Sequence, residues 1–149
     1  MSEFLIVNEN DFMKARDKIR NGKNKTIVFS SNDDELNRKI LEKEKIDVLL
    51  LSQSGKKDRM KQRESGLNHV LAREAMKNGV AIGINFDEIV ESRGKQKAEI
   101  LARIRQNIKL CNKSKLKMKF IHFKHERNLH DLKSLGSVLG MPTWMTSSL

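Results

Sequence analysis

Short apolar runs alternate with amphipathic, helix-period segments along almost the whole chain, and this alternation constrains the fold more than any other feature. The runs predict five β-strands, at Phe4–Val7, Thr26–Phe29, Asp47–Leu51, Val80–Ile84 and Met118–Phe123. The third and fourth runs are continuously apolar, as expected of parallel strands covered on both faces. Repeated βα units of this kind predict an α/β fold, with a parallel sheet flanked by helices. The pattern leaves two architectures open, an open doubly wound sheet and an arc of an incomplete barrel.

The length of the chain limits these choices. It has 149 residues, which predicts a single α/β domain over residues 1–145 with a frayed tail at 146–149. A complete eight-unit barrel usually needs about 250 residues, so a complete one is excluded. One cysteine rules out a disulfide framework and fits a reducing compartment. No apolar run approaches the roughly 20 residues of a membrane helix, and the start has no signal-peptide layout. We expect a cytoplasmic protein.

Capping residues predict where the helices begin and end. Asn10, Asn32 (with Glu35 three residues later) and Ser65 are the expected N-caps. Gly79 and Gly140 are the expected stops. Pro142 is then placed to begin another turn. The inner faces expected from helical spacing are Phe12, Ala15 and Ile19; Leu36 and Ile40; Leu67, Val70, Leu71 and Ala75; and Leu129, Leu132 and Leu139.

The positive charge is unevenly distributed. The net charge is +11, yet residues 1–50 hold ten basic and ten acidic side chains, so the remainder carries the whole excess. Two stretches concentrate it, Lys56–Arg63 with one acid and Arg93–Lys119 with one acid. Segregated charge of this kind is typical of a polyanion binder. The alternative is a solvated surface in a lysine-rich protein. A membrane surface is less favoured, because the basic stretches lack interleaved Trp or Phe anchors.

A long helix expected from about Lys95 to Ser114 displays part of this charge. Its predicted buried stripe consists of Ile100, Ile104, Ile108 and Cys111. Arg105, Lys109 and Lys113 follow one another at four-residue spacing close to the opposite side, and Lys95 joins this row. Like charges at this spacing disfavour an isolated helix by about 0.2–0.5 kcal/mol each, so the row makes most sense if phosphates bind it.

Residues suited to catalysis are few. His122, His125 and His130 cluster near the last strand, but a strand-to-loop HxxH does not place both rings on one face, so we expect an ordinary polar loop rather than a metal site. Cys111 is expected to be an inert core thiol. The pair Asp87–Glu88 follows a strand and suits a helix cap or a magnesium contact, of which we favour the cap. We therefore predict no catalytic residue and no bound metal. Because Tyr is absent and Trp occurs once, phosphate and shape recognition of a folded RNA is favoured over stacking on a single strand.

The central block, DVLLLS…GKKD…SGLNHVLAREAMKNGVAIGINFDEIV, resembles the family of archaeal ribonuclease P protein component 3, relatives of the thirty-kilodalton-class subunit of the eukaryotic nuclear enzyme. The resemblance covers roughly residues 25–141 and is most specific over Ser65–Phe86. It extends to Arg103, Arg105, Asn107, Lys109 and Leu110 of the long helix, and more weakly to Asp131, Leu132 and Leu139–Met141. Two departures are evident: Arg59–Glu64 is an insertion, and His122–His125 replaces the small-residue strand end that the family usually has.

The resemblance implies an incomplete TIM-barrel-like architecture (PHP-like, a fold shared with a metallohydrolase superfamily), because the family's N-terminal βα repeats are missing. It also implies partnership with ribonuclease P protein component 2 and other ribonuclease P proteins, and assembly onto a catalytic RNA that uses magnesium to remove the 5′ leader of precursor tRNA. The chain would then be a non-catalytic RNA-binding subunit. The alternative from another class is a stand-alone metal-dependent phosphoesterase that uses the late histidines. The RNA-facing residues predicted from charge are Lys56, Lys57, Arg59, Lys61, Arg63, Arg93, Lys95, Lys97, Arg105, Lys109 and Lys113.

Overall fold

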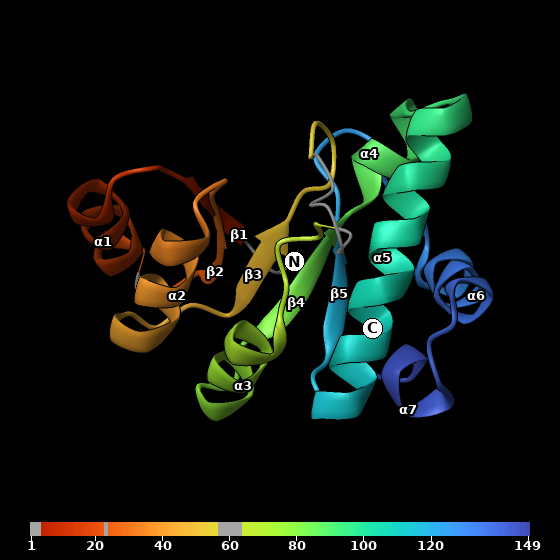
Figure 1. Ribbon diagram of the computed structural model, residues 1–149. Helices are drawn as coiled ribbons and strands as arrows, with labels where there is room; N and C mark the ends of the chain where they lie inside the picture. Colours follow the sequence, from red (N-terminus) through yellow and green to blue (C-terminus); the bar gives the residue numbers. More distant parts are fainter. Residues whose placement is uncertain (1–3, 23, 57–63) are drawn as a thin grey trace.

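Five parallel strands form a single sheet in the computed structural model, which describes residues 4–22, 24–56 and 64–149 (Figure 1). All five predicted strands are confirmed, with ends that differ by at most two residues. The strands are β1 (Phe4–Asn8), β2 (Thr26–Ser30), β3 (Val48–Leu51), β4 (Ala81–Asn85) and β5 (Met118–Ile121).

The order of the strands decides between the two architectures. The sheet runs β1-β2-β3-β4-β5 in chain order, and every neighbouring pair is parallel. One row of paired residues crosses four strands as Ile6, Val28, Val48 and Ala81. A doubly wound sheet reverses its order at a switch point, and no reversal occurs here. The sheet is therefore an arc of a barrel, which confirms the incomplete TIM-barrel-like prediction.

Helices fill the connections between the strands, and two more follow the last strand. They are α1 (Phe12–Asn21), α2 (Asp34–Lys43), α3 (His69–Lys77), α4 (Phe86–Glu91), α5 (Gly94–Ser114), α6 (Leu129–Leu139) and α7 (Thr143–Thr146). Within the described ranges, none of these helices has the length and apolar character needed to cross a membrane.

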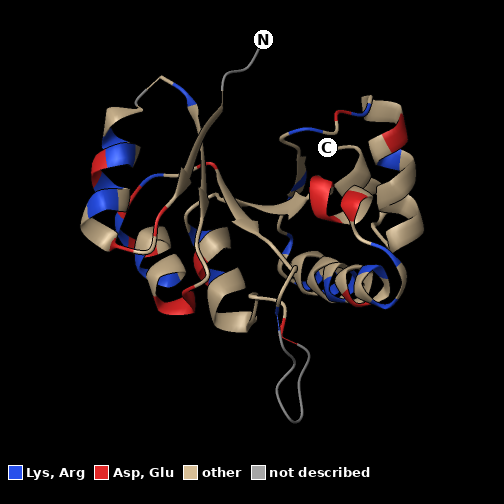
Figure 2. Cartoon of the chain, turned by 90° about the horizontal axis from the view of Figure 1, so that it is seen from above, with Lys and Arg blue, Asp and Glu red and all other residues tan. Residues whose placement is uncertain are grey.

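The core lies mainly between the outer face of the sheet and the helices (Figure 2). Alternation along β3 shows the division, because Leu49 and Leu51 belong to this large cluster whereas Val48 and Leu50 belong to a smaller one on the inner face. Both sets are buried, which explains why this strand is continuously apolar. The sheet thus brings the ends of its strands, and the loops that follow them, to one common edge.

Two helices begin one residue later than the sequence predicts. Asp11 rather than Asn10 caps α1, and its carboxylate accepts the Lys14 N–H at 3.2 Å. Asp33 rather than Asn32 caps α2, and its carboxylate accepts the N–H groups of the first turn at 3.0 and 3.3 Å. In both places an asparagine is followed by an aspartate, both of which can cap a helix, and the aspartate occupies the N-cap position.

The starts of α3 and α6 also correct the predicted inner faces. Ser65 does not cap α3; Asn68 does, and its side chain accepts the Leu71 N–H at 2.9 Å. Val70 is 51% exposed and Leu129 is 50% exposed, so neither belongs to the core. Each lies in the first turn of its helix.

The predicted helix ends fit the structure better than the predicted starts. Gly79 has φ +67° directly after the cap residue of α3, and Gly140, with φ +109°, caps α6. Pro142 precedes α7 as its N-cap, as predicted.

The last residues, for which the sequence predicts fraying, pack against the rest of the protein. Leu149 packs on the core, and the Ser148 carbonyl accepts a hydrogen bond from the Lys119 ammonium.

Candidate nucleic-acid interface

Helix α5 has one buried and one exposed face, as its spacing predicts. Its inner stripe is at most 2% exposed and consists of Ile100, Ile104, Ile108 and Cys111. Burial raises the pKa of the Cys111 thiol to about 12, which suits an inert core thiol. The stripe fixes the rotation of the helix, so the residues on its opposite face must point to solvent.

That opposite face carries the predicted row. Arg105, Lys109 and Lys113 are all exposed, and across the described ranges no carboxylate lies within 4.0 Å of any of them. In Figure 2, α5 is seen nearly end-on and shows basic residues along its length, with Glu99 as the one acid in its sequence. We call these three residues the outer row. It is a set of cations with no carboxylate partner among the described residues.

The other predicted cations near the start of α5 differ among themselves. Arg93 is the N-cap residue and is exposed, but its side chain makes no capping hydrogen bond. The Lys95 ammonium lies 4.0 Å from a Glu99 oxygen. Because the Lys95 side chain is highly exposed, this ion pair is weak. Lys97 is half-buried. Arg93 is therefore as accessible to a ligand as the outer row, whereas Lys95 has a weak carboxylate neighbour and Lys97 is less exposed.

The predicted basic loop is only partly placed. Lys57, Arg59, Lys61 and Arg63 lie outside the described residues. Lys56 is half-buried, and its charge acts on the carboxylate of Glu88.

Arg103 holds the two ends of this loop together, a role that charge counting did not predict. The guanidinium donates from Nε to the Glu64 carbonyl at 2.9 Å and from Nη2 to the Lys56 carbonyl at 3.1 Å. The residue is only 3% exposed. A signal existed in the sequence, because Arg103 stands three residues after Ile100 of the buried stripe, a spacing that places it on the flank of the inner face. A charged residue there must find polar partners.

Two amide side chains complete this junction between the loop and α5. Gln53 Nε2 donates to the carbonyls of Leu51 (3.2 Å) and Ser65 (2.9 Å), and Asn107 Nδ2 donates to Ser65 at 3.4 Å. Gln53, Ser65 and Asn107 are each at most 3% exposed. The base of the basic loop is thereby fixed to the helix that carries the outer row.

Glu88 anchors the loop from the side of the sheet, and the preferred prediction of a helix cap is wrong for it. Asn85 caps α4, and its side chain accepts the Glu88 N–H. The Glu88 carboxylate instead accepts the backbone N–H groups of Gln53 and Ser54, each at 2.8 Å. Burial raises the pKa of this carboxyl above its ordinary value, although the two hydrogen bonds and the charge of Lys56 act in the opposite direction.

Asp87 does the same for the segment after β5. It is 7% exposed, and its carboxylate accepts the N–H groups of Phe123, Lys124 and His125 at 3.1, 2.9 and 3.2 Å. Burial raises its pKa, but these three hydrogen bonds outweigh burial and leave the pKa below its ordinary value. The acidic pair therefore organises two loops at one edge of the sheet.

The late histidines do not converge in the structure. His122 and His130 are exposed, and His125 Nε2 lies 3.2 Å from a Glu91 oxygen. Over residues 4–22, 24–56 and 64–149, no three His, Cys, Asp or Glu side chains are grouped so that they could hold a metal.

Comparisons with known proteins agree with the fold and with the resemblance. A family model described as RNase P subunit p30 matches residues 5–143, which extends further toward the N-terminus than the roughly 25–141 expected. The chain is 34% identical over 106 residues to ribonuclease P protein component 3 of Methanococcus maripaludis strain C7, which covers 71% of this chain and 43% of that protein. It is 35% identical over 102 residues to the protein of the same name from Methanocaldococcus jannaschii; the match covers 67% of this chain and 41% of that protein.

A solved structure is similar over nearly the whole chain. A chain in the cryo-EM structure of archaeal ribonuclease P with mature tRNA matches with a TM-score of 0.76 and 26% identity, covering 95% of this chain and 62% of that one. The present chain spans less than half the length of the curated relatives that it matches.

Proposed function

Because the chain belongs to the RNase P subunit p30 family, we propose that it is a protein subunit of ribonuclease P that binds and supports the catalytic RNA. The RNA, with its magnesium, removes the 5′ leader from precursor tRNA, and this chain contributes cations rather than catalytic groups. Its protein partners are component 2 and other ribonuclease P proteins, and it works in the cytoplasm.

One observation carries this proposal. The outer row of α5 has no carboxylate partner in the described part of the chain, and its like charges stand four residues apart, where they repel one another. An RNA backbone offers regularly spaced phosphates, which lysine and arginine contact without reading sequence. The loop junction supports the proposal, because Arg103 of α5 donates to the carbonyls of Lys56 and Glu64, and four further cations of the sequence stand between these two residues.

Reconstitution tests the proposal directly. Ribonuclease P RNA is assayed for leader cleavage of precursor tRNA at low magnesium, alone and with component 2 plus this chain. We expect the wild-type chain to increase cleavage, and the variant Arg105→Gln/Lys109→Gln/Lys113→Gln to increase it much less. The matched control is Lys14→Gln/Arg73→Gln/Lys77→Gln, which removes the same residue types from exposed positions on α1 and α3. Equal activity of both variants would contradict the proposed role of the row, and no effect of the wild-type chain would contradict the proposed function.

A further inference from the structure

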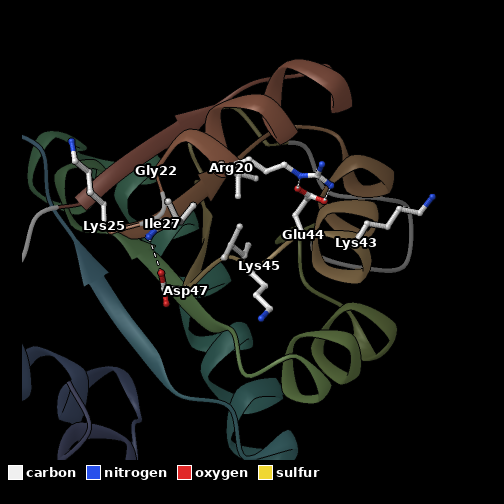
Figure 3. Close-up of a pocket in the computed structure, with 10 residues that line it drawn as sticks. Arg20, Gly22, Lys25, Ile27, Lys43, Glu44, Lys45 and Asp47 are labelled. Carbon is white, nitrogen blue, oxygen red and sulfur yellow. Dashed lines mark hydrogen bonds and ion pairs between the residues drawn. The ribbon is translucent and has the colours of Figure 1, made fainter.

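A hollow of about 430 Å³ lies at the opposite edge of the sheet, where β2 and β3 begin (Figure 3). Its floor is apolar and consists of Ile19, Ile27 and Ile46. Its rim carries four cations and two carboxylates: Arg20, Lys25, Lys43, Lys45, Glu44 and Asp47. An adjoining hollow of about 420 Å³ shares Arg20, Gly22 and Lys25, and is also lined by Asn21 and Asn24.

The cations lie at this edge because α1 and α2 both have an acidic N-cap and basic residues in their last turn. In a parallel βα arrangement, each helix starts at the carboxyl edge of the sheet and ends at the amino edge. Asp11 caps α1 and Asp33 caps α2, so carboxylates stand at the carboxyl edge. Arg20 and Lys43 lie in the last turns, at the amino edge. The ten basic and ten acidic side chains of residues 1–50 cancel in number, yet the rim of the hollow holds four cations and two carboxylates.

Both carboxylates of the rim are already engaged. Arg20 donates to the two oxygens of Glu44 at 3.0 and 3.2 Å, and the Glu44 side chain is only 5% exposed. Asp47 Oδ2 accepts the backbone N–H of Ile27 at 2.8 Å. Figure 3 shows both interactions as dashed lines, at two sides of the hollow. The rim acids are thus held by neighbouring residues.

The three lysines of the rim have no such partner. Lys25, Lys43 and Lys45 are exposed, and across residues 4–22, 24–56 and 64–149 no carboxylate lies within 4.0 Å of their ammonium groups. Their side chains extend from different sides of the rim (Figure 3). In Figure 3 their ammonium groups point outward from the hollow in three directions, so the positive charge surrounds the hollow rather than lining its interior.

We propose that this hollow binds a nucleotide segment of an RNA, with phosphates at Lys25, Lys43 and Lys45 and a ribose or base against the isoleucine floor. The inference rests on the proposed function and adds a second contact, at the edge of the sheet opposite to the loop junction. An anionic ligand suits the unpaired lysines, and an apolar floor suits the flat face of a base. A free phosphate would use only the first of these features.

Salt dependence of RNA affinity tests the inference. Each phosphate contact contributes about −0.7 to −0.9 to the slope of log affinity against log salt. We expect Lys43→Gln/Lys45→Gln to make the slope shallower by about 1.5 for ribonuclease P RNA, since two contacts are lost. The control Lys14→Gln/Lys77→Gln removes two exposed, unpaired lysines outside the hollow and should leave the slope unchanged. An unchanged slope in the hollow variant would overturn the inference, whereas the proposed function would stand as long as wild-type protein still stimulates cleavage.

Backbone amide resonances locate the ligand independently. Titration with a short oligouridylate should shift the Gly22 and Lys45 amides of the wild-type protein and shift them much less in the hollow variant. Inorganic phosphate alone is the second arm. Shifts with phosphate but none with the oligonucleotide would show an adventitious anion only and would overturn the inference. Loss of component 2 binding in the hollow variant with unchanged RNA slope would assign the hollow to an acidic protein segment and would also overturn it.

Discussion

Arg103 and Arg105 lie two residues apart on α5, and the structure uses them in opposite ways. Arg103 is 3% exposed and donates to two carbonyl groups of the same chain. Arg105 is exposed and has no partner among the described residues. The buried guanidinium stabilises the fold, and the exposed one is left for a ligand. Local charge density therefore does not identify a binding surface; the pairing of each cation does.

The largest effect that distinguishes the two arginines is on stability. Arg103→Met leaves the carbonyls of Lys56 and Glu64 without these donors, and hydrogen bonds to charged groups contribute about 1.5–3 kcal/mol. We expect the free energy of unfolding to fall by about 2–3 kcal/mol for Arg103→Met, measured by urea denaturation. Arg105→Met should change it by less than about 0.5 kcal/mol. Similar losses in both variants would contradict the different roles of the two arginines.

The same contrast applies to carboxylates. Asp87→Asn weakens the hydrogen bonds that this side chain accepts from three N–H groups after β5. We therefore expect the free energy of unfolding to fall by about 1–2 kcal/mol at pH 7. Because the folded-state pKa of Asp87 lies below the ordinary 3.8, its stabilisation is present above that pH and is lost as the pH falls through the folded-state value. The difference between wild type and variant should therefore shrink below about pH 3.8, as measured by urea unfolding across pH.

Glu88 should show the opposite pH dependence with a smaller amplitude. Its folded-state pKa lies above the ordinary 4.5, so its protonation favours the folded state. That contribution is fully present below pH 4.5 and is lost as the pH rises through the folded-state value. Glu88→Gln should lower the free energy of unfolding by less than about 1 kcal/mol at pH 7. In this variant the free energy of unfolding should not decline as the pH rises above 4.5. A decline of equal size in the variant would assign it to another group.

The smallest stability effect belongs to the outer row. Arg105→Gln/Lys109→Gln/Lys113→Gln removes two like-charge contacts at four-residue spacing, each worth about 0.2–0.5 kcal/mol. We expect thermal unfolding to show unchanged or slightly increased stability. A marked loss of stability would mean that these cations serve the fold and not a ligand.

The sequence was sufficient for features that depend on nearby residues. The strands and the buried stripe of α5 follow from periodicity, because burial on one side repeats with the geometry of the element. The N-cap positions are harder to predict from the sequence, because adjacent residues such as Asn10 and Asp11 have equal capping ability. The exposed positions Val70 and Leu129 fit a helical period but lie in the first turns of their helices, where the predicted inner face does not reach the core.

The contacts that build the loop junction could not be predicted from spacing. Glu88 lies 34 and 35 residues from the N–H groups that it accepts, and Arg103 lies 39 and 47 residues from its two carbonyls. Such pairs form only once the parallel sheet has brought the ends of β3 and β4 together. Counting charges likewise treated residues 1–50 as neutral, because a sum contains no information about which edge of the sheet each side chain occupies.

The salt dependence of RNA affinity shows whether the outer row of α5 binds phosphates. Ribonuclease P RNA is titrated with wild-type protein, the triple outer-row variant and the matched control Lys14→Gln/Arg73→Gln/Lys77→Gln at several salt concentrations. We expect the outer-row variant to have a slope shallower by about 2–3, because three phosphate contacts are lost, and the control to have the wild-type slope. Equal slopes for the two variants would contradict it.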